Sequence, residues 1–222
     1  MKNKAISILF AVSLFFFIIT FSIGLPIYFR PFYYAHIEVY DLVDESGFTR
    51  DEIREAYDEV LDYLTIPGRE FGAGVMRYSE NGASHFADCK MLFDLNATVF
   101  IISSLILITL WVLRKRGKLE SFKLGKFSSA FWTAVSIIAL FVVVVVLASL
   151  DFNRAFVIFH KIFFPGKDNW IFSYRDDEII RVLPQEFFMN CAILIVCSAL
   201  IISLAIMVKE IAVLNKSKRK NR

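Results

Sequence analysis

The residues best suited to chemistry stand directly before a long apolar stretch. His85, Asp88 and Lys90 lie within the sequence SHFADCK, and MLFDLNATVFIISSLILITLWVL follows at once. On a helix, Asp88 lies one turn after His85, where its carboxylate can hydrogen-bond one ring nitrogen and make the other a better base. Alternatively, His85 and Lys90 are ordinary interface residues, which are common at the ends of membrane spans. The spacing leaves both interpretations open.

A second histidine, His160, lies in the aromatic sequence DFNRAFVIFHKIFF. On a helix, His160 stands at the edge of the face that carries the phenylalanines, beside Asn153 two turns earlier. An aromatic face at helical spacing is usually core or an interfacial anchor, which explains the phenylalanines but not the histidine. Arg154 either extends to lipid headgroups or binds an anion such as a developing oxyanion. The third histidine, His36, has no acid at a fixed helical offset and is a poor catalytic candidate.

The composition predicts a membrane protein. Hydrophobic residues make up 57% of the chain, and 24 of its 222 residues are phenylalanine, which exceeds what a soluble domain uses. A helix that spans the bilayer needs about 20 apolar residues. We therefore predict an α-helical integral membrane protein, one membrane domain with four transmembrane helices at about residues 5–29, 91–113, 127–150 and 187–208.

The charge distribution predicts the orientation of these spans. Segments 114–126 and 209–222 each carry six Lys or Arg and one acid, which places both segments and the N-terminus in the cytoplasm. The remaining segments, 30–90 and 151–186, hold 19 of the 22 acids and all three histidines, and we expect them to form a small mixed extracytoplasmic cap. Basic residues next to a span are a topology signal and attract anionic membrane lipid, so we predict no nucleic-acid partner.

The clearest element of this cap is a helix in FTRDEIREAYDEVLDYLTIPG. Thr49 and Glu52 form a capping box at its start, and Pro67-Gly68 closes it. One face is apolar and the other acidic. The sequences HIEVYDLV, residues 36–43, and GAGVMRYS, residues 72–79, alternate weakly and predict short strands.

Several familiar chemistries lose their usual sequence support. The chain has no HExxH, GxSxG, P-loop or GxGxxG motif. Its three cysteines can form at most one disulfide and have no zinc-binding spacing. What remains is a pair of histidines from separate outer segments in an aromatic site at the membrane surface. Such a pair suits acid/base chemistry on a lipid.

These residues resemble the bacterial lipoprotein intramolecular transacylase family over nearly the whole chain. The resemblance is carried by H-x-x-D-x-K at His85, Asp88 and Lys90, then FHKIFF, then Trp170, then LPQEFF before the last span. The sequence departs from the family pattern at one place. Where F-S-x-R-E-x-x-H is expected before the first histidine, this chain has Asn81-Gly82 in YSENGASH.

The resemblance implies acyl transfer within one substrate in the bacterial cell membrane. Family members move the sn-2 acyl chain of a diacylglyceryl-modified lipoprotein to the α-amino group of its N-terminal cysteine, which gives the lyso form. His85, oriented by Asp88, is expected to be the base, and His160 to stabilise the oxyanion or protonate the leaving oxygen, with these roles exchangeable. No metal or cofactor is required. The expected supporting residues are Asp88, Lys90, Asn153, Arg154 and Trp170, and the expected substrate-lining residues are Tyr33, Tyr34, Phe159 and Phe163.

Two other functions are compatible with the same residues. A lipid-directed hydrolase or an intermolecular acyltransferase would use the histidines with water or another lipid as the acceptor. A membrane receptor or assembly protein would use the cap to bind a partner, and its histidines would tolerate replacement. Only intramolecular transfer leaves the total acyl count of a lipoprotein unchanged.

Overall fold

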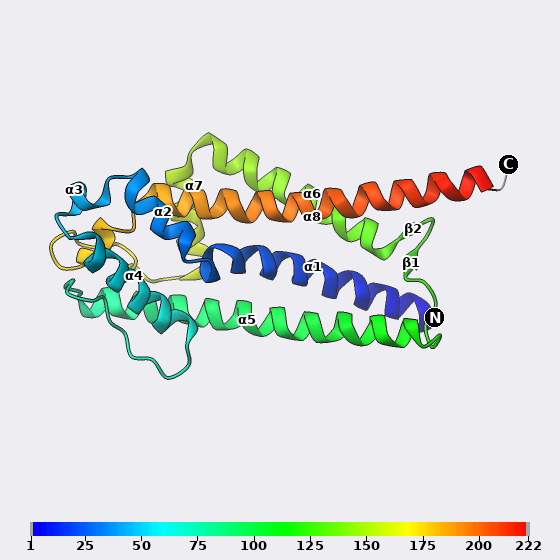
Figure 1. Cartoon of the computed structure of the whole chain (residues 1–222), viewed down its shortest axis with the longest axis horizontal. Coiled ribbons are helices and arrows are strands. Elements are labelled where there is room, and N and C mark those ends of the chain that lie inside the picture. The colour runs from blue at the N-terminus through cyan, green and yellow to red at the C-terminus, as the bar shows by residue number, and fades with distance from the viewer. Residues whose placement is uncertain (1, 221–222) are drawn as a thin grey trace. The chain divides into compact units, whose positions relative to one another are not determined.

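The computed structural model describes residues 2–220, and their regular elements are nearly all helices (Figure 1). Within this described part of the chain, four helices are long and apolar enough to cross a membrane, which confirms the predicted fold class. Their bounds are α1 Lys2–Tyr28, α5 Glu80–Lys115, α6 Ser129–Leu150 and α8 Gln185–Lys220. Helix α5 begins at Glu80, well before the predicted span at 91–113, so His85 lies on the same helix as the span.

The chain divides into two compact units, and each of the four long helices contributes residues to both. Unit 1 contains residues 1–23, 97–147 and 194–222, and unit 2 contains residues 24–96 and 148–193. The predicted cap segments, 30–90 and 151–186, both fall within unit 2.

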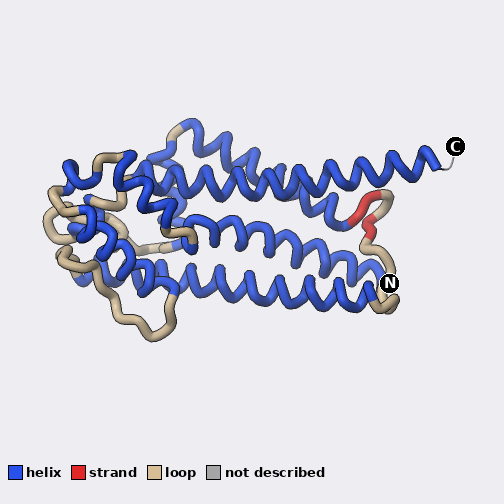
Figure 2. Tube along the Cα trace, in the orientation of Figure 1, coloured by secondary structure: helices blue, strands red, loops and turns tan. Residues whose placement is uncertain are grey.

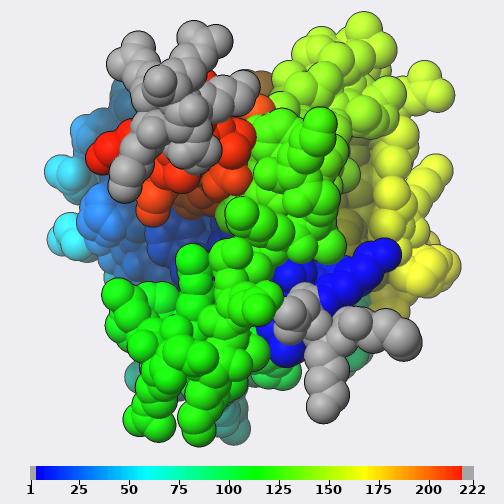
Figure 3. Space-filling model, turned by 90° about the vertical axis from the view of Figure 1, so that its right-hand side faces the viewer, coloured from blue at the N-terminus to red at the C-terminus, as the bar shows by residue number. Residues whose placement is uncertain are grey.

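Unit 1 is held together by apolar packing of its helices. Ile18 of α1, Ile137 and Phe141 of α6 and Ala199 of α8 form a buried cluster. Strands β1 Lys123–Leu124 and β2 Phe127–Ser128 form a short antiparallel hairpin, drawn in red in Figure 2. The start of α1, the loop after α5 and the end of α8 appear on one face of unit 1 (Figure 3).

Unit 2 contains the short helices and a larger core. These helices are α2 Pro31–Val39, α3 Leu42–Ser46, α4 Arg50–Thr65, α7 Phe152–Phe163 and the 3-10 helix η1 Glu178–Arg181. The predicted capping box of α4 is present, because the Glu52 carboxylate accepts from Thr49 N and Thr49 Oγ1 accepts from Glu52 N. The predicted apolar face of α4 is buried in the core, at Ile53, Tyr57, Val60, Leu61 and Leu64.

The two predicted strands of the cap are wrong. Residues 36–43 belong mostly to α2 and α3, and residues 72–79 form no regular element. In α2, the buried residues are Tyr33, His36 and Ile37. Their i, i+3, i+4 spacing is that of a helix, because successive residues of a strand point to opposite faces. In 72–79, Gly74 has a φ of 56°, which a strand does not adopt. The weak alternation in both segments was therefore not a strand signal, and the cap is made of helices and loops.

Candidate active site

His85 and His160 lie together in unit 2, although 75 positions of sequence separate them. Their ring centroids are 5.7 Å apart and their ring planes differ by 31°. Both side chains are buried, with exposures of 6% for His85 and 7% for His160. The tertiary structure thus brings together the two residues that the sequence singled out, one from α5 and one from α7.

The backbone of α7 determines which nitrogen of His160 can react. Asp151 caps the start of the helix by accepting from Arg154 N at 3.0 Å. One turn before the histidine, the Phe156 carbonyl oxygen lies 2.8 Å from His160 Nδ1. Because a carbonyl only accepts hydrogen bonds, Nδ1 carries the hydrogen, and in the neutral ring Nε2 holds the lone pair. Burial lowers the pKa of His160, against the opposing effect of the Phe156 carbonyl, and this favours that neutral ring.

Aromatic rings enclose the pair. Phe164 and Phe172 meet the His85 ring edge-on, at centroid distances of 4.9 and 5.5 Å. Trp170 lies 4.7 Å from the His160 ring at an angle of 31°, and its indole nitrogen donates to the Lys167 carbonyl. Such an apolar shell disfavours two imidazolium cations side by side, since neither charge would be solvated.

The two nitrogens of His85 have different surroundings. Nε2 lies 3.4 Å from Cys89 Sγ. Nδ1 is buried and has no hydrogen-bond partner among the residues that the structure describes. A buried, unpaired nitrogen is costly, so a polar group of a substrate that reached Nδ1 would relieve this cost.

Asp88 does not orient His85 as the sequence predicted. Its carboxylate forms an ion pair with Lys167 and accepts from Asn169 Nδ2 at 3.0 Å. Asn169 Nδ2 also lies 3.3 Å from Ser84 Oγ. The loop after α7 supplies a cation and an amide that compete for the carboxylate, and Asp88 consequently ties this loop to α5.

Three other expected supporting residues lie away from the histidine pair. The Lys90 ammonium donates to the Tyr63 carbonyl at 2.6 Å, at the end of α4. Asn153 Oδ1 accepts from Gln185 Nε2. The Arg154 side chain is exposed. Lys90 and Asn153 therefore join elements of unit 2, and only Trp170 of the supporting set contacts a histidine ring.

The expected substrate-lining residues divide into two groups. Tyr33 is fully buried, stacks on Tyr57 at 3.7 Å and donates to the Val182 carbonyl, while the Tyr34 hydroxyl donates to the Asp58 carboxylate. These two tyrosines belong to the core and to the α2–α4 contact, so neither lines the site. In contrast, the Phe159 ring lies 5.5 Å from His160 and 4.6 Å from Phe163.

His36 is a core histidine whose nitrogens both have partners. Its Nδ1 lies 2.6 Å from the Phe32 carbonyl oxygen, and its Nε2 lies 3.0 Å from Asn190 Nδ2. Among residues 2–220, no group of three or more His, Cys, Asp or Glu side chains could hold a metal ion.

Besides its chain neighbour Phe86, three residues that contact His85 were not predicted from the sequence. Cys89 follows it by four residues, and this helical spacing was a usable signal. Phe164 and Phe172 lie at and beyond the end of α7, and no local pattern connects them with α5. Their contacts depend on how the loop after α7 folds.

The fold and the site define a class of protein, namely an α-helical, multi-pass membrane protein with a buried histidine pair suited to acid/base chemistry. The model of the family "Lipoprotein intramolecular transacylase Lit" matches residues 8–188. The chain therefore belongs to the lipoprotein intramolecular transacylase (Lit) family. It is an acyltransferase of a family that acts on lipoproteins, and the predicted family and enzyme class are confirmed.

Solved structures of a Bacillus cereus protein agree with this assignment. The membrane integral lipoprotein intramolecular transacylase Lit of that organism is 26% identical, with a TM-score of 0.84 and 98% of each chain covered. Its H85R variant is 27% identical, with a TM-score of 0.77 and coverage of 100% of this chain and 95% of the other. Its H85A variant is 26% identical, with a TM-score of 0.77 and coverage of 98% and 96%. No curated protein matches the chain significantly.

The contact between Cys89 and His85 predicts a modest effect on the rate of acyl transfer. Replacing Cys89 by alanine removes one weak hydrogen bond to Nε2, so we expect the rate to fall by about 2–10-fold. Cys89→Ser should stay close to the wild type, because a hydroxyl can also pair with Nε2. The measurement is the initial rate on a reporter lipoprotein, for variants with equal melting temperatures.

Cys191→Ala provides the matched control, because Cys191 packs against the core of unit 2 and not against the histidines. The rate of acyl transfer by Cys191→Ala should equal that of the wild type. Equal rates for wild type and Cys89→Ala would show that the thiol does not orient the ring.

Proposed function

We propose that this chain moves the sn-2 acyl chain of a diacylglyceryl-modified lipoprotein to the α-amino group of the same molecule's N-terminal cysteine, which yields the lyso form. The observation that carries the proposal is the buried pair of His85 and His160, 5.7 Å apart, in a member of the Lit family. The substrate is a lipoprotein held in the membrane, and no second lipid is needed as acceptor.

The reaction needs one proton to move from nitrogen to oxygen. The neutral amine attacks the ester carbonyl, the new N–C bond forms, and a base removes a proton from the nitrogen. The C–O bond to the glyceryl group then breaks, and its oxygen takes up a proton. One histidine can perform both transfers, because the proton that it accepts from nitrogen is the one that it returns to oxygen.

The hydrogen bonds favour His160 as this base. Its Nδ1–H is held by the Phe156 carbonyl, so Nε2 accepts the proton from the amine and later delivers it to the glyceryl oxygen. His85 then donates from Nδ1 to the developing oxyanion, while the Cys89 thiol donates to Nε2. This assignment exchanges the roles first expected from the sequence, because a neutral His160 fixed in this tautomer has no hydrogen on Nε2 to offer an oxyanion.

The shape of the substrate explains why the site needs little else. Amine and ester belong to one molecule, so the protein has to bend the headgroup until the two groups meet. Positioning of this kind is a large part of many rate enhancements. Trp170 and Phe159, which pack around His160, are placed to hold the bent headgroup, and the exposed Phe163 beside them to contact an acyl chain.

We further propose that the site lies on the extracytoplasmic side, with both termini in the cytoplasm. The basic segments 114–126 and 209–222 support this orientation. Both belong to unit 1, and the loop after α5 and the end of α8 appear on one of its faces (Figure 3). The histidine pair belongs to unit 2.

Mass spectrometry of a reporter lipoprotein tests the proposed reaction. The chain is expressed in a bacterium that lacks its own copy, and the N-terminal peptide of the reporter is fragmented. We expect N-acyl, monoacylglyceryl cysteine with an unchanged total number of acyl chains. A hydrolase would instead leave the peptide one acyl chain short, and an intermolecular acyltransferase would add one. A diacylglyceryl peptide with a free amine, despite folded protein in the membrane, would contradict catalysis of this reaction.

A further inference from the structure

We propose that Asp177 is a positioning residue for His85, because it caps the first turn of α5 from a different part of the chain. The role of His85 in this inference rests on the proposed function. The cap itself is a feature of the fold and can be tested without catalysis.

The contacts at the start of α5 carry the proposal. Ser79 precedes the helix, and its backbone N–H and hydroxyl both donate to Asp177 Oδ1, at 2.8 and 2.7 Å. Ser79 Oγ in turn accepts from Gly82 N at 3.0 Å. Asp177 is 4% exposed, and its second oxygen accepts from Ser173 N at 3.3 Å. Because a buried carboxylate is stable only with such donors, Asp177 acts as a structural cap at the start of the helix.

This arrangement reproduces a capping box with one part supplied from outside the helix. In α4, the Glu52 side chain reaches back within the same helix to Thr49 N. The equivalent position in α5, three residues after Ser79, is Gly82, which has no side chain. Asp177 supplies the carboxylate instead, because its Oδ1 accepts from Ser79 N.

Gly82 and Asp177 depend on each other sterically. A Cβ atom at position 82 would lie 2.3 Å from Asp177 Oδ1 and 3.1 Å from its Cγ. Real Cβ atoms do not approach oxygen this closely, so any side chain at position 82 would displace the Asp177 carboxylate. The glycine therefore leaves the space that the aspartate occupies, and this explains how the chain accommodates Gly82 at this position.

The capped turn is directly connected to the site. His85 follows Gly82 by three residues on α5. Phe172, five residues before Asp177, lies 3.2 Å from the Cβ position of Gly82 and packs edge-on against the His85 ring at 5.5 Å. The segment that supplies the cap thus also supplies a wall of the histidine site.

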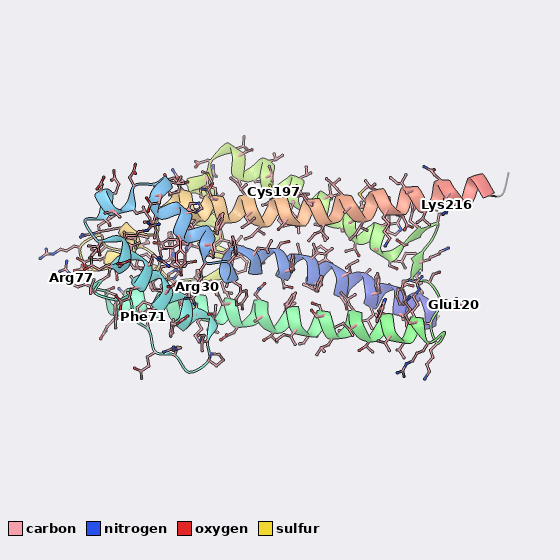
Figure 4. All side chains as sticks on the ribbon, in the orientation of Figure 1. Arg30, Phe71, Arg77, Glu120, Cys197 and Lys216 are labelled. Carbon is pink, nitrogen blue, oxygen red and sulfur yellow. The ribbon has the colours of Figure 1, made fainter. Side chains whose placement is uncertain are left out.

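Neighbouring contacts hold this segment in place. The backbone nitrogen of Arg77 donates to the Glu178 carboxylate, and the backbone nitrogen of Glu178 donates to the Arg77 carbonyl, each at 2.9 Å. The Arg77 guanidinium, labelled in Figure 4, also pairs with Glu178 Oε1 at 2.5 Å. These contacts join η1 to the residues before α5, so the cap is part of a hydrogen-bonded junction.

Moving the carboxylate from position 177 to position 82 tests the proposed cap. Asp177→Ala should lower kcat about tenfold with little change in KM, because the loss of a helix cap loosens the turn before His85. Gly82→Glu alone should be at least as impaired, since its side chain collides with Asp177. The double variant Asp177→Ala with Gly82→Glu should recover to within about threefold of the wild type, because the new glutamate can reach Ser79 N as in a capping box.

Hydrogen exchange gives a readout that does not depend on the reaction. The amides of Ser79 and Gly82 should exchange faster in Asp177→Ala and be protected again in the double variant. Asp177→Asn keeps the acceptor for Ser79 but turns a donor toward Ser173 N. It should therefore fall between the wild type and the alanine variant in both measurements, and it provides the test if the alanine variant does not accumulate.

The possible outcomes separate this proposal from the proposed function. If the wild type shows no acyl transfer, the proposed function fails, and the exchange rates still test the cap. If Asp177→Ala shows wild-type amide protection, or the double variant recovers neither kcat nor protection relative to Asp177→Ala, the cap proposal is overturned.

Discussion

Replacing His85 by alanine is expected to lower the rate of acyl transfer by about 10²–10⁴-fold, the range for losing an acid/base or oxyanion-stabilising group. The structure gives two reasons for a large effect. His85 lies 5.7 Å from His160 between centroids, and its Nδ1 is a buried nitrogen without a hydrogen-bond partner among the described residues. Loss of the ring removes the proposed donor to the oxyanion, which is needed in the transition state and not in the ground state.

The measurement is single-turnover conversion of a reporter lipoprotein by purified protein. His85→Ala should show a reduced rate at saturating substrate, with a smaller change in substrate affinity. His36→Gln is the matched control, because His36 is equally a buried histidine of unit 2 but is bound to Phe32 and Asn190. A rate for His85→Ala within a few-fold of the control would show that His85 takes no part in the reaction.

Replacing His160 by alanine is expected to cause a loss of similar or greater size, because the same atom, Nε2, both accepts and returns the proton. Its helix should survive the change, because alanine is a good helix former and the hydrogen bond that is lost joins His160 to the Phe156 carbonyl of the same helix. A folded but inactive His160→Ala protein, compared at equal melting temperature, is the expected result.

The pH dependence of the wild type follows from the state of His160. Burial lowers the pKa of His160 from its ordinary value of about 6.5. The neutral ring is the base, so activity is present above the folded-state pKa and is lost as the pH falls through it. We therefore expect the limb that His160 contributes to the rate profile to lie below the usual range of histidine, whereas the substrate's α-amine, which must also be neutral, contributes its own limb near a pKa of about 7.7–8.0. A second limb near about 6.5, in addition to that of the amine, would contradict a neutral, buried His160.

The free energy of unfolding should also decrease as the pH falls, because of protonation of His160. The unfolded chain binds a proton on this histidine at a higher pH than the folded chain does, so protonation favours unfolding as the pH falls. The stability that is present above the unfolded pKa is lost progressively below it, and His160→Ala should lose less stability over the same pH range. Melting temperatures measured from neutral to mildly acidic pH in detergent check this difference.

Features that depend on neighbouring residues along the chain were predictable from the sequence. The four spans follow from length and hydropathy, since a bilayer imposes a minimum length of apolar helix. The start and the buried face of α4 follow from its capping box and from the spacing of Ile53, Tyr57 and Val60. Likewise, His85 and His160 could be selected by residue type, position and family resemblance, and the structure places them together.

Only the tertiary structure decided which side chains meet across the fold. Spacing on α5 allowed Asp88 to reach His85, but its carboxylate instead binds Lys167 and Asn169 of a distant loop. Tyr33 had the residue type of a substrate contact, but the packing of α2 on Tyr57 buries it in the core. Asp177 reaches the start of α5 from almost 100 residues away. The sequence by itself determines local helix formation and membrane insertion, because both act on contiguous residues, whereas hydrogen bonds and packing between distant segments depend on how the helices and loops come together.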